Sequence, residues 1–157
     1  MIRPFSSTTT KSVVRKAVST DCAAVAALIR EFGYAVTEEL IEQWLVRISS
    51  GACGAVFVTE HDGEVAGFLN FHIVPLLQFS GGLGRITAVG VGSRFRHLGV
   101  GRQLVAAAEQ FAWAHGCARV AATTSGHHPG ASAFYEGLGY EFEARRFLKS
   151  RPVYQNP

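Results

Sequence analysis

The segment that most restricts the fold is residues 85–116, where a strand pattern changes to a helix pattern across a turn with two glycines. Arg85–Val91 is a β-type run. Apolar or aromatic residues then recur at helical spacing, at Val100, Leu104, Ala108, Phe111 and His115. Gly99 and Gly101 lie at the start of this helix, shortly after Arg96. A strand that leads into a helix with one sheet-packing face predicts an α/β domain.

Upstream of this segment, the sequence predicts one strand and then two helices. Val13–Ala17 is a β-type run, and Thr20 and Asp21 are candidate N-cap residues for a helix that ends at Gly33. Thr37 precedes a second helix with one apolar face, formed by Leu40, Ile41, Trp44, Leu45 and Ile48. The sequence therefore predicts that two consecutive helices connect the first strand to the second.

A hairpin and three short elements complete the pattern. Ala55–Glu60 and Val65–Val74 are β-rich runs separated by Asp62-Gly63, a dipeptide typical of tight antiparallel hairpins. The last predicted elements are a strand over Arg119–Thr124, a helix over Ala131–Leu138 and a strand from Tyr140 to about Lys149. The order β-α-α-β-β-β-α-β-α-β predicts a central mixed, mostly antiparallel sheet with helices on both faces.

Composition limits the classes of protein to which the chain can belong. The 157 residues are 48% hydrophobic, which suits one domain over residues 13–157 behind a flexible lead-in at 1–12. A net charge of +3 without a run of five basic residues argues against a nucleic-acid partner. The lead-in lacks the apolar core of a secretory signal, although its Arg, Ser and Thr content is also typical of organellar transit segments.

The cysteines and the hydropathy predict a cytoplasmic protein without a membrane span. Cys22, Cys53 and Cys117 are widely separated and odd in number, which argues against a disulfide framework and favours a reducing compartment. They form no C-x-x-C pair, and His127-His128 matches no closed zinc site, so we expect no metal. No stretch has the apolar length that a membrane span requires.

The spacing of the two glycines distinguishes between three phosphate-binding turns. A dinucleotide fingerprint needs a third glycine where Leu104 stands, and a Walker A loop needs a Gly-Lys pair that the chain lacks. The remaining pattern is Arg-x-x-Gly-x-Gly over Arg96–Gly101, in which bare backbone N–H groups at a helix N-terminus can approach a pyrophosphate. The alternative is that Gly99 and Gly101 only permit close packing of the helix on the sheet.

Two motifs carry a resemblance to a known family. VGVGSRFRHLGVGRQLVAAAEQFAWAHGC resembles the acetyl-CoA-binding motif of the GCN5-related N-acetyltransferase (GNAT) family, and HHPGASAFYEGLGYE resembles the second signature of that family. The two motifs have the order and separation found in the family, and the resemblance covers about Val13 to Lys149. It implies the single-domain GNAT fold and an enzyme that transfers acetyl directly from acetyl-CoA to a primary amine of a small molecule.

Two other functions remain open at this point. The acceptor is alternatively a protein N-terminus or lysine, and the domain is alternatively a non-catalytic acyl-CoA-binding regulatory module. Exposed edge strands also allow a homodimer. We expect neither a nucleic acid nor a membrane as a partner.

The resemblance implies a set of cofactor-binding residues. Backbone groups of the strand would pair with the pantetheine arm, and amides at the start of the helix would hold the pyrophosphate with nearby arginines. These residues are Val89, Val91, Arg96, His97, Leu98, Gly99, Val100, Gly101, Arg102 and His128. The chain departs from the family pattern twice, because Ser93 replaces a usual proline and His128 replaces a common asparagine.

The resemblance also implies catalytic and substrate-binding residues. Tyr135 would protonate the thiolate that leaves when an amine attacks the thioester, although an aromatic at this place is also an ordinary core residue. Some family members carry an acid on the strand before the turn, but Ile86–Val91 has none. His72, which shares a strand face with Asn70 near the expected centre of the sheet, is therefore the candidate base or anchor of a water relay, with a structural histidine as the alternative. Glu31 and Tyr34 are candidate acceptor contacts between the first two helices.

Overall fold

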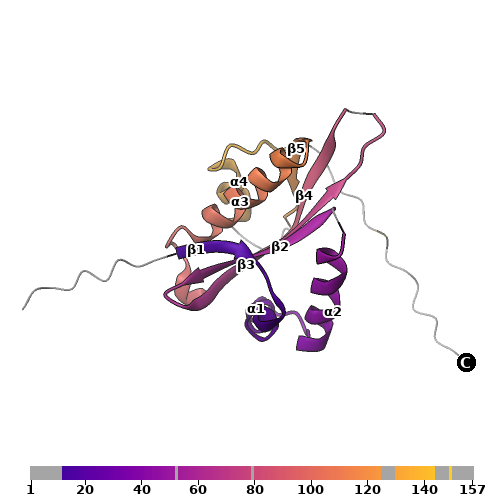
Figure 1. Ribbon diagram of the computed structural model, residues 1–157. Coiled ribbons are helices and arrows are strands. Elements are labelled where there is room, and N and C mark those ends of the chain that lie inside the picture. The colour runs from indigo at the N-terminus through magenta and orange to yellow at the C-terminus, as the bar shows by residue number, and fades with distance from the viewer. Residues whose placement is uncertain (1–11, 52, 79, 125–129, 144–148, 150–157) are drawn as a thin grey trace, which may run out of the picture.

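Five strands form one sheet in which spatial order follows chain order, β1-β2-β3-β4-β5 (Figure 1). The computed structural model describes residues 12–51, 53–78, 80–124, 130–143 and 149. The strands are β1 Ser12–Lys16, β2 Gly54–His61, β3 Glu64–Val74, β4 Gly82–Val91 and β5 Cys117–Ala122. Successive strands pair antiparallel from β1 to β4, and β5 runs parallel to β4. The predicted mixed, mostly antiparallel sheet is confirmed.

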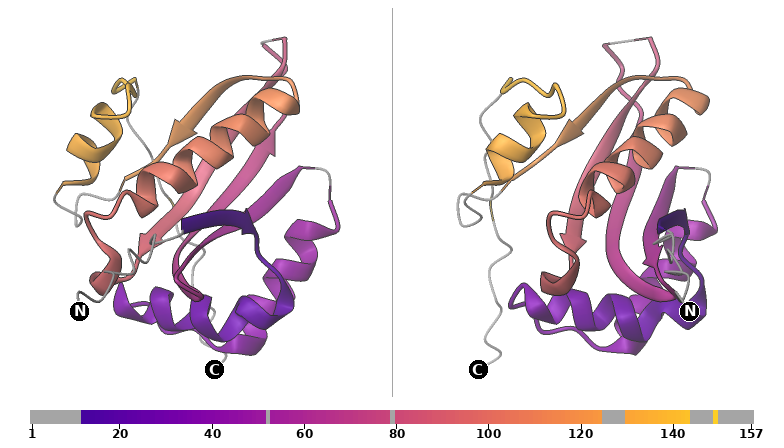
Figure 2. Two further views of the ribbon diagram at one scale, coloured as in Figure 1. Left: turned by 60° about the vertical axis from the view of Figure 1, so that its left-hand side comes forward. Right: turned by 90° about the vertical axis from the view of Figure 1, so that its left-hand side faces the viewer.

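Helices cover both faces of the sheet (Figure 2). The helices are α1 Cys22–Glu31, α2 Glu38–Ser49, α3 Val100–Ala114 and α4 Ala131–Glu136, with 3-10 turns η1 Ser19–Asp21 and η2 Ser93–Phe95. One core cluster lies beneath α3 and includes Leu69, Phe71 and Ile86. A second cluster joins Val25 and Leu28 of α1 to Val58 and Phe68 of the sheet. Alternate residues of β3 therefore serve opposite cores, because successive strand side chains point to opposite faces.

Local sequence signals explain several of the element boundaries. The hairpin between β2 and β3 turns at Asp62 and Gly63, whose φ values of 50° and 84° are those of a type I′ turn. Thr37 caps α2, because its hydroxyl oxygen accepts a hydrogen bond from the Leu40 N–H at 3.2 Å. Gly33 follows α1 with a φ of 86°. These three predictions from the sequence are confirmed.

The predicted last strand is not formed by the residues that can be checked. Tyr140 to Glu143 and Lys149 have no strand structure, and the remainder of that prediction lies outside the described residues. The backbone N–H of Tyr140 instead donates to the Tyr135 carbonyl at 3.0 Å. Its hydroxyl donates to Glu109 of α3 at 2.9 Å. Tyr140 thus fastens the end of α4 to α3, which outweighs the strand preference of its neighbours.

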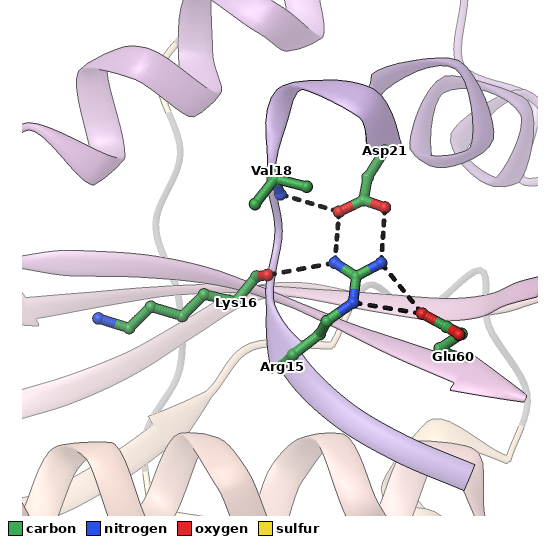
Figure 3. A network of polar contacts seen from close by, with 5 residues as sticks. All are labelled: Arg15, Lys16, Val18, Asp21 and Glu60. Atoms are coloured by element: carbon green, nitrogen blue, oxygen red, sulfur yellow. Dashed lines mark hydrogen bonds and ion pairs between the residues drawn. The ribbon is translucent and has the colours of Figure 1, made fainter. Parts of the chain in front are cut away.

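Asp21 precedes α1, but its carboxylate makes no hydrogen bond to the helix and instead holds the end of β1 (Figure 3). It accepts two hydrogen bonds from the Arg15 guanidinium, at 2.7 and 2.9 Å, and one from the Val18 N–H at 2.8 Å. Arg15 also contacts Glu60 of β2 at 3.3 Å. The hydrogen bonds from Arg15 keep the pKa of Asp21 below its ordinary value against the opposing effect of burial.

Substituting Asp21 by asparagine is expected to lower the free energy of unfolding by about 2 kcal/mol at pH 7, because Arg15 loses a charged bidentate partner. The folded-state pKa of Asp21 is depressed, so this stabilisation is present above the unfolded carboxyl pKa and is lost as pH falls through the folded pKa. Denaturant unfolding at pH 7 and below pH 3 measures the change. The difference in the free energy of unfolding between wild type and Asp21→Asn should become smaller below pH 3.

The exposed pair of Arg94 and Glu64, at 3.2 Å, provides the matched control. Glu64→Gln should cost less than about 0.5 kcal/mol at either pH, because solvent screens an exposed ion pair. A loss for Glu64→Gln equal to that for Asp21→Asn would show that the network around Arg15 contributes no more than an ordinary surface contact.

Candidate functional site

The edge of β4 becomes free where β5 diverges from it. The parallel pairing runs from Gly82 opposite Cys117 to Ile86 opposite Ala122, while β4 continues to Val91. Within the described part of the chain, no strand pairs with this edge beyond Ile86. An extended ligand can therefore add to β4 as a further strand would. The predicted cofactor residues Val89 and Val91 lie on this edge, with their side chains half buried against the core beneath α3.

A bulge interrupts β4 at the start of the free edge. Ala88 lies opposite Asn70, but Ile86 lies opposite Phe71, so Thr87 is an extra residue in the ladder. The Thr87 hydroxyl donates to the Asn70 carbonyl at 3.3 Å. Thr87 and Ala88 are both exposed. The bulge thus presents backbone to solvent at the place where the two strands separate.

The turn between η2 and α3 is shaped by two residues in the left-handed region, His97 with a φ of 63° and Gly99 with a φ of 81°. The helical ladder begins with Gln103 N–H donating to the Gly99 carbonyl at 3.0 Å. The N–H groups of the first helical residues, Val100, Gly101 and Arg102, therefore have no acceptor within the helix. Free N–H groups at a helix N-terminus, together with the helix dipole, are suited to binding an anion.

The two glycines of this turn have different roles. A Cβ at Gly99 would meet no described residue within 4 Å, so this glycine serves the backbone conformation of an open turn. A Cβ at Gly101 would lie 3.3 Å from the Phe134 ring of α4, so this glycine permits close packing. The packing alternative from the sequence thus holds for Gly101 and fails for Gly99.

The charges around the turn also favour an anion. Arg96 and Arg102 are exposed, and neither forms an ion pair with any residue that the structure describes. The first turn of α3 carries no acid. His97 and Leu98 are exposed as well, whereas the Val100 side chain is only 1% exposed and belongs to the core. Val100 can therefore contribute only its backbone, and His128 lies outside the described residues.

Tyr135 is placed on α4 against the same core that supports the β4 edge. The residue is 9% exposed, and burial raises the pKa of its phenol to about 12. A phenol with this pKa stays protonated at neutral pH and can donate a hydrogen bond or a proton. The Tyr140 ring packs edge-on against it, with ring centroids 5.3 Å apart.

Tyr140 and Glu109 form a support that the sequence analysis did not identify. Burial and the hydrogen bond to Glu109 both raise the pKa of Tyr140, so its hydroxyl also stays protonated. This bond ties α4, and with it Tyr135, to α3. Nothing in the local pattern at Glu109 indicates a partner 31 residues away.

His72 lies on β3, within the sheet as predicted, and its imidazole is close to Gly54 of β2. It shares a β3 face with Asn70, as expected, and both side chains lie on the side of α1 and α2. A Cβ added at Gly54 would lie 3.3 Å from His72 Nδ1 and 3.1 Å from Ile48 of α2. His72 therefore lies two residues along β3 from Asn70, the residue next to the bulge, and it is beside the C-terminal half of α2.

The predicted acceptor contacts lie at the end of α1. Glu31 Oε2 accepts a hydrogen bond from the Ser93 backbone N–H at 3.0 Å. A proline at position 93 would have no N–H, so the departure from the family pattern provides the donor that joins α1 to the end of β4. Tyr34 is 58% exposed in the connection between α1 and α2.

A cavity of about 120 Å³ lies between α1, α2 and the sheet. Most of its walls are apolar. The lining residues are Ala17, Asp21, Cys22, Val25, Ile29, Ile41, Trp44, Leu45, Ile48, Val56, Phe68, Asn70 and Ala88. Asn70 Oδ1 is buried and has no hydrogen-bond partner among the described residues. The sequence analysis used Asn70 only to define a strand face, although an asparagine within an apolar strand is itself a signal.

The structure also bears on metals and membranes. No group of three or more potential metal ligands occurs within the described ranges. The cysteines Cys22, Cys53 and Cys117 are free. No helix in the described part of the chain combines the length and hydrophobicity needed to cross a bilayer.

Residues 23–140 match the sequence model of the Acetyltransferase (GNAT) family. The chain belongs to the GNAT family. It is an N-acetyltransferase of the family that uses acetyl-CoA, and the fold and resemblance predicted from the sequence are confirmed. None of the curated protein sequences matches the chain.

Several solved structures share the GNAT fold of this chain. A transcriptional regulator from Bacillus halodurans C-125 superposes with a TM-score of 0.81 at 23% identity, covering 90% of this chain and 99% of the other. Aminoglycoside N-acetyltransferase AAC(6')-Iy in complex with CoA has a TM-score of 0.81 at 20% identity, covering 92% and 97%. Glucosamine-6-phosphate N-acetyltransferase from Arabidopsis thaliana has a TM-score of 0.77 at 24% identity, covering 89% and 98%.

Proposed function

We propose that this GNAT protein transfers the acetyl group of acetyl-CoA directly to a primary amine of a small molecule. The observation that carries the proposal is the open turn before α3 beside the free edge of β4. The turn offers backbone N–H groups without helical acceptors and two arginines, Arg96 and Arg102, that form no ion pair with a described residue, and these groups suit a diphosphate. The edge from Thr87 to Val91 offers backbone groups to an extended arm.

The chain's residues then act in sequence on the bound reactants. Acetyl-CoA supplies an acetyl thioester when it is bound. The amine nitrogen forms a bond to the carbonyl carbon as the carbon–sulfur bond breaks, and Tyr135 gives its hydroxyl proton to the departing sulfur. We assign the removal of the amine proton to His72 through water, because Ile86–Val91 carries no acid. Glu31 holds the start of η2, and the exposed Tyr34 is a candidate acceptor contact in the connection between α1 and α2.

The support for a small amine comes from the acceptor side of the sheet. The cavity under α1 and α2 holds about 120 Å³, a volume suited to a compact group. The aminoglycoside and glucosamine-6-phosphate N-acetyltransferases with the same fold are named for small-molecule acceptors, which agrees with the proposal.

Thermal unfolding with acetyl-CoA tests the cofactor half of the proposal. At 100 times its Kd, a ligand that binds only the folded state adds about 2.7 kcal/mol. For a domain of this size we expect acetyl-CoA and CoA to raise the Tm by roughly 5–10 °C. NAD, which also carries a diphosphate but no pantetheine arm, should raise it much less. Equal shifts with NAD, or no shift with acetyl-CoA, would contradict the proposed site.

A further inference from the structure

The cavity beneath α1 and α2 indicates the chemical class of the amine that accepts the acetyl group. We propose that this cavity takes a compact hydrocarbon group of the acceptor, whose amine nitrogen donates a hydrogen bond to Asn70 Oδ1. The preferred substrates are then primary amines with an aliphatic or aromatic substituent of about four to seven carbons. The inference rests on the proposed acetyl transfer, because it names the second substrate of that reaction.

The position of the cavity connects it with the reaction site. Asn70 and Ala88 both line the cavity and lie opposite each other in the register of β3 and β4. Ala88 also belongs to the free β4 edge and directly follows the bulged Thr87. The cavity therefore extends to the strand edge that we assign to the thioester, and a group seated in it has its amine within reach of that edge.

The chemistry of the walls excludes a polar group. Among the described lining residues, Asp21 alone is charged, and its carboxylate already accepts hydrogen bonds from Arg15 and from the Val18 N–H. The Cys22 thiol stays uncharged, because burial raises its pKa. A buried hydroxyl group of a substrate would find few partners here and would lose its bonds to water. A hydrocarbon group loses nothing in the same place and gains by leaving water.

Asn70 Oδ1 supplies the polar end of the site. It is buried without a partner among the described residues, and such an atom is costly unless a ligand or water satisfies it. A single acceptor does not suit an ordered water, which needs two to four polar partners. An amine donor beside an apolar tail satisfies this atom and fills the rest of the cavity.

The volume sets the size of the hydrocarbon group. Cavities of about 150 Å³ with apolar walls bind benzene. The cavity of about 120 Å³ therefore suits a butyl, isobutyl or phenyl group. Larger acceptors, such as amino sugars joined to further rings, exceed it.

The amine series that tests this inference is ethylamine, propylamine, butylamine and benzylamine, assayed by release of CoA thiol from saturating acetyl-CoA. Each added methylene should raise kcat/KM about fourfold until the cavity is full. The compound 3-aminopropan-1-ol has nearly the shape of butylamine, with a hydroxyl in place of the terminal methyl group. It should react at least about tenfold more slowly than butylamine, because its hydroxyl is buried without a partner.

Two variants test the named residues. Ala88→Leu fills the cavity from the β4 side and should bring the ratio of kcat/KM for butylamine over ethylamine close to one, whereas Ala106→Leu on the exposed face of α3 should leave this ratio unchanged. Asn70→Leu should raise KM for the amines about tenfold and leave KM for acetyl-CoA as it is. Its Tm should not fall, because the change removes a buried oxygen that has no hydrogen-bond partner in the described part of the chain.

The outcomes separate this inference from the proposed function. If 3-aminopropan-1-ol, glucosamine or a lysine peptide is acetylated as well as butylamine, the hydrocarbon site is wrong and acetyl transfer stands. If acetyl-CoA raises the Tm but none of the four amines reacts, the hydrocarbon site is also wrong. If acetyl-CoA neither binds nor reacts, the proposed function and this inference fail together.

Discussion

Replacing Tyr135 by phenylalanine is expected to lower kcat by about 10²–10³-fold, because the proposed mechanism assigns to Tyr135 the proton that the departing sulfur receives. KM for acetyl-CoA should stay within about twofold, since the turn at Gly99 and the β4 edge are untouched. The pKa of Tyr135, raised to about 12 by burial, keeps the phenol in its donor form throughout the assay range. The wild-type rate should therefore show no alkaline loss from this group below about pH 11.

Steady-state kinetics and acetyl-CoA titrations of the same preparation measure both effects. Tyr140→Phe serves as the matched control, because it also removes one phenolic hydroxyl, the one that donates to Glu109. That change should cost about 1 kcal/mol of stability and much less activity than the Tyr135 substitution. Wild-type kcat in Tyr135→Phe would exclude Tyr135 as the acid.

The second large effect is expected from Gly99→Val, which should weaken binding of acetyl-CoA by about ten- to a hundredfold. Gly99 has a φ of 81°, which a β-branched residue strongly disfavours. Because nothing lies within 4 Å of the added Cβ, the substitution acts on the turn and not on the core. Relaxation of the turn reorients the amides at the start of α3.

Gly116→Val is a control with the same local strain. Gly116 follows the other end of α3, has a φ of 75° and likewise has open space around its Cβ position. Both variants should lose similar stability, but only Gly99→Val should lose the Tm shift and the calorimetric affinity for acetyl-CoA. Equal affinity in the two variants would show that the turn does not bind the cofactor.

The regular elements could be predicted because their causes are local. The Asp62-Gly63 turn, the Thr37 cap and the apolar face of α2 each depend on residues within a few positions of one another. The last predicted strand failed where it can be checked because a distant residue decides the conformation. Tyr140 is held by Glu109, whose position depends on how α4 docks against α3.

The candidate site also has one part that depends on local sequence and another part that depends on contacts between distant residues. The turn from Arg96 to Gly101 is one contiguous motif, so its residues could be named before the structure was known. The acceptor side depends on register, since only the pairing of Asn70 with Ala88 shows that the cavity reaches the β4 edge. The bond from Ser93 to Glu31 joins residues 62 positions apart and has no signal in either neighbourhood.

The two separate cores have a consequence for how new specificities can arise. The proposed cofactor-binding turn packs on the core beneath α3, whereas the proposed acceptor cavity borders the core of α1, and the sheet separates the two cores. Substitutions at Val25 or Ile41 therefore reshape one half of the molecule without disturbing the packing of the other. Protein design or natural selection can thus change the amine specificity by substitutions in one core, while the proposed acetyl-CoA site on the other core stays the same.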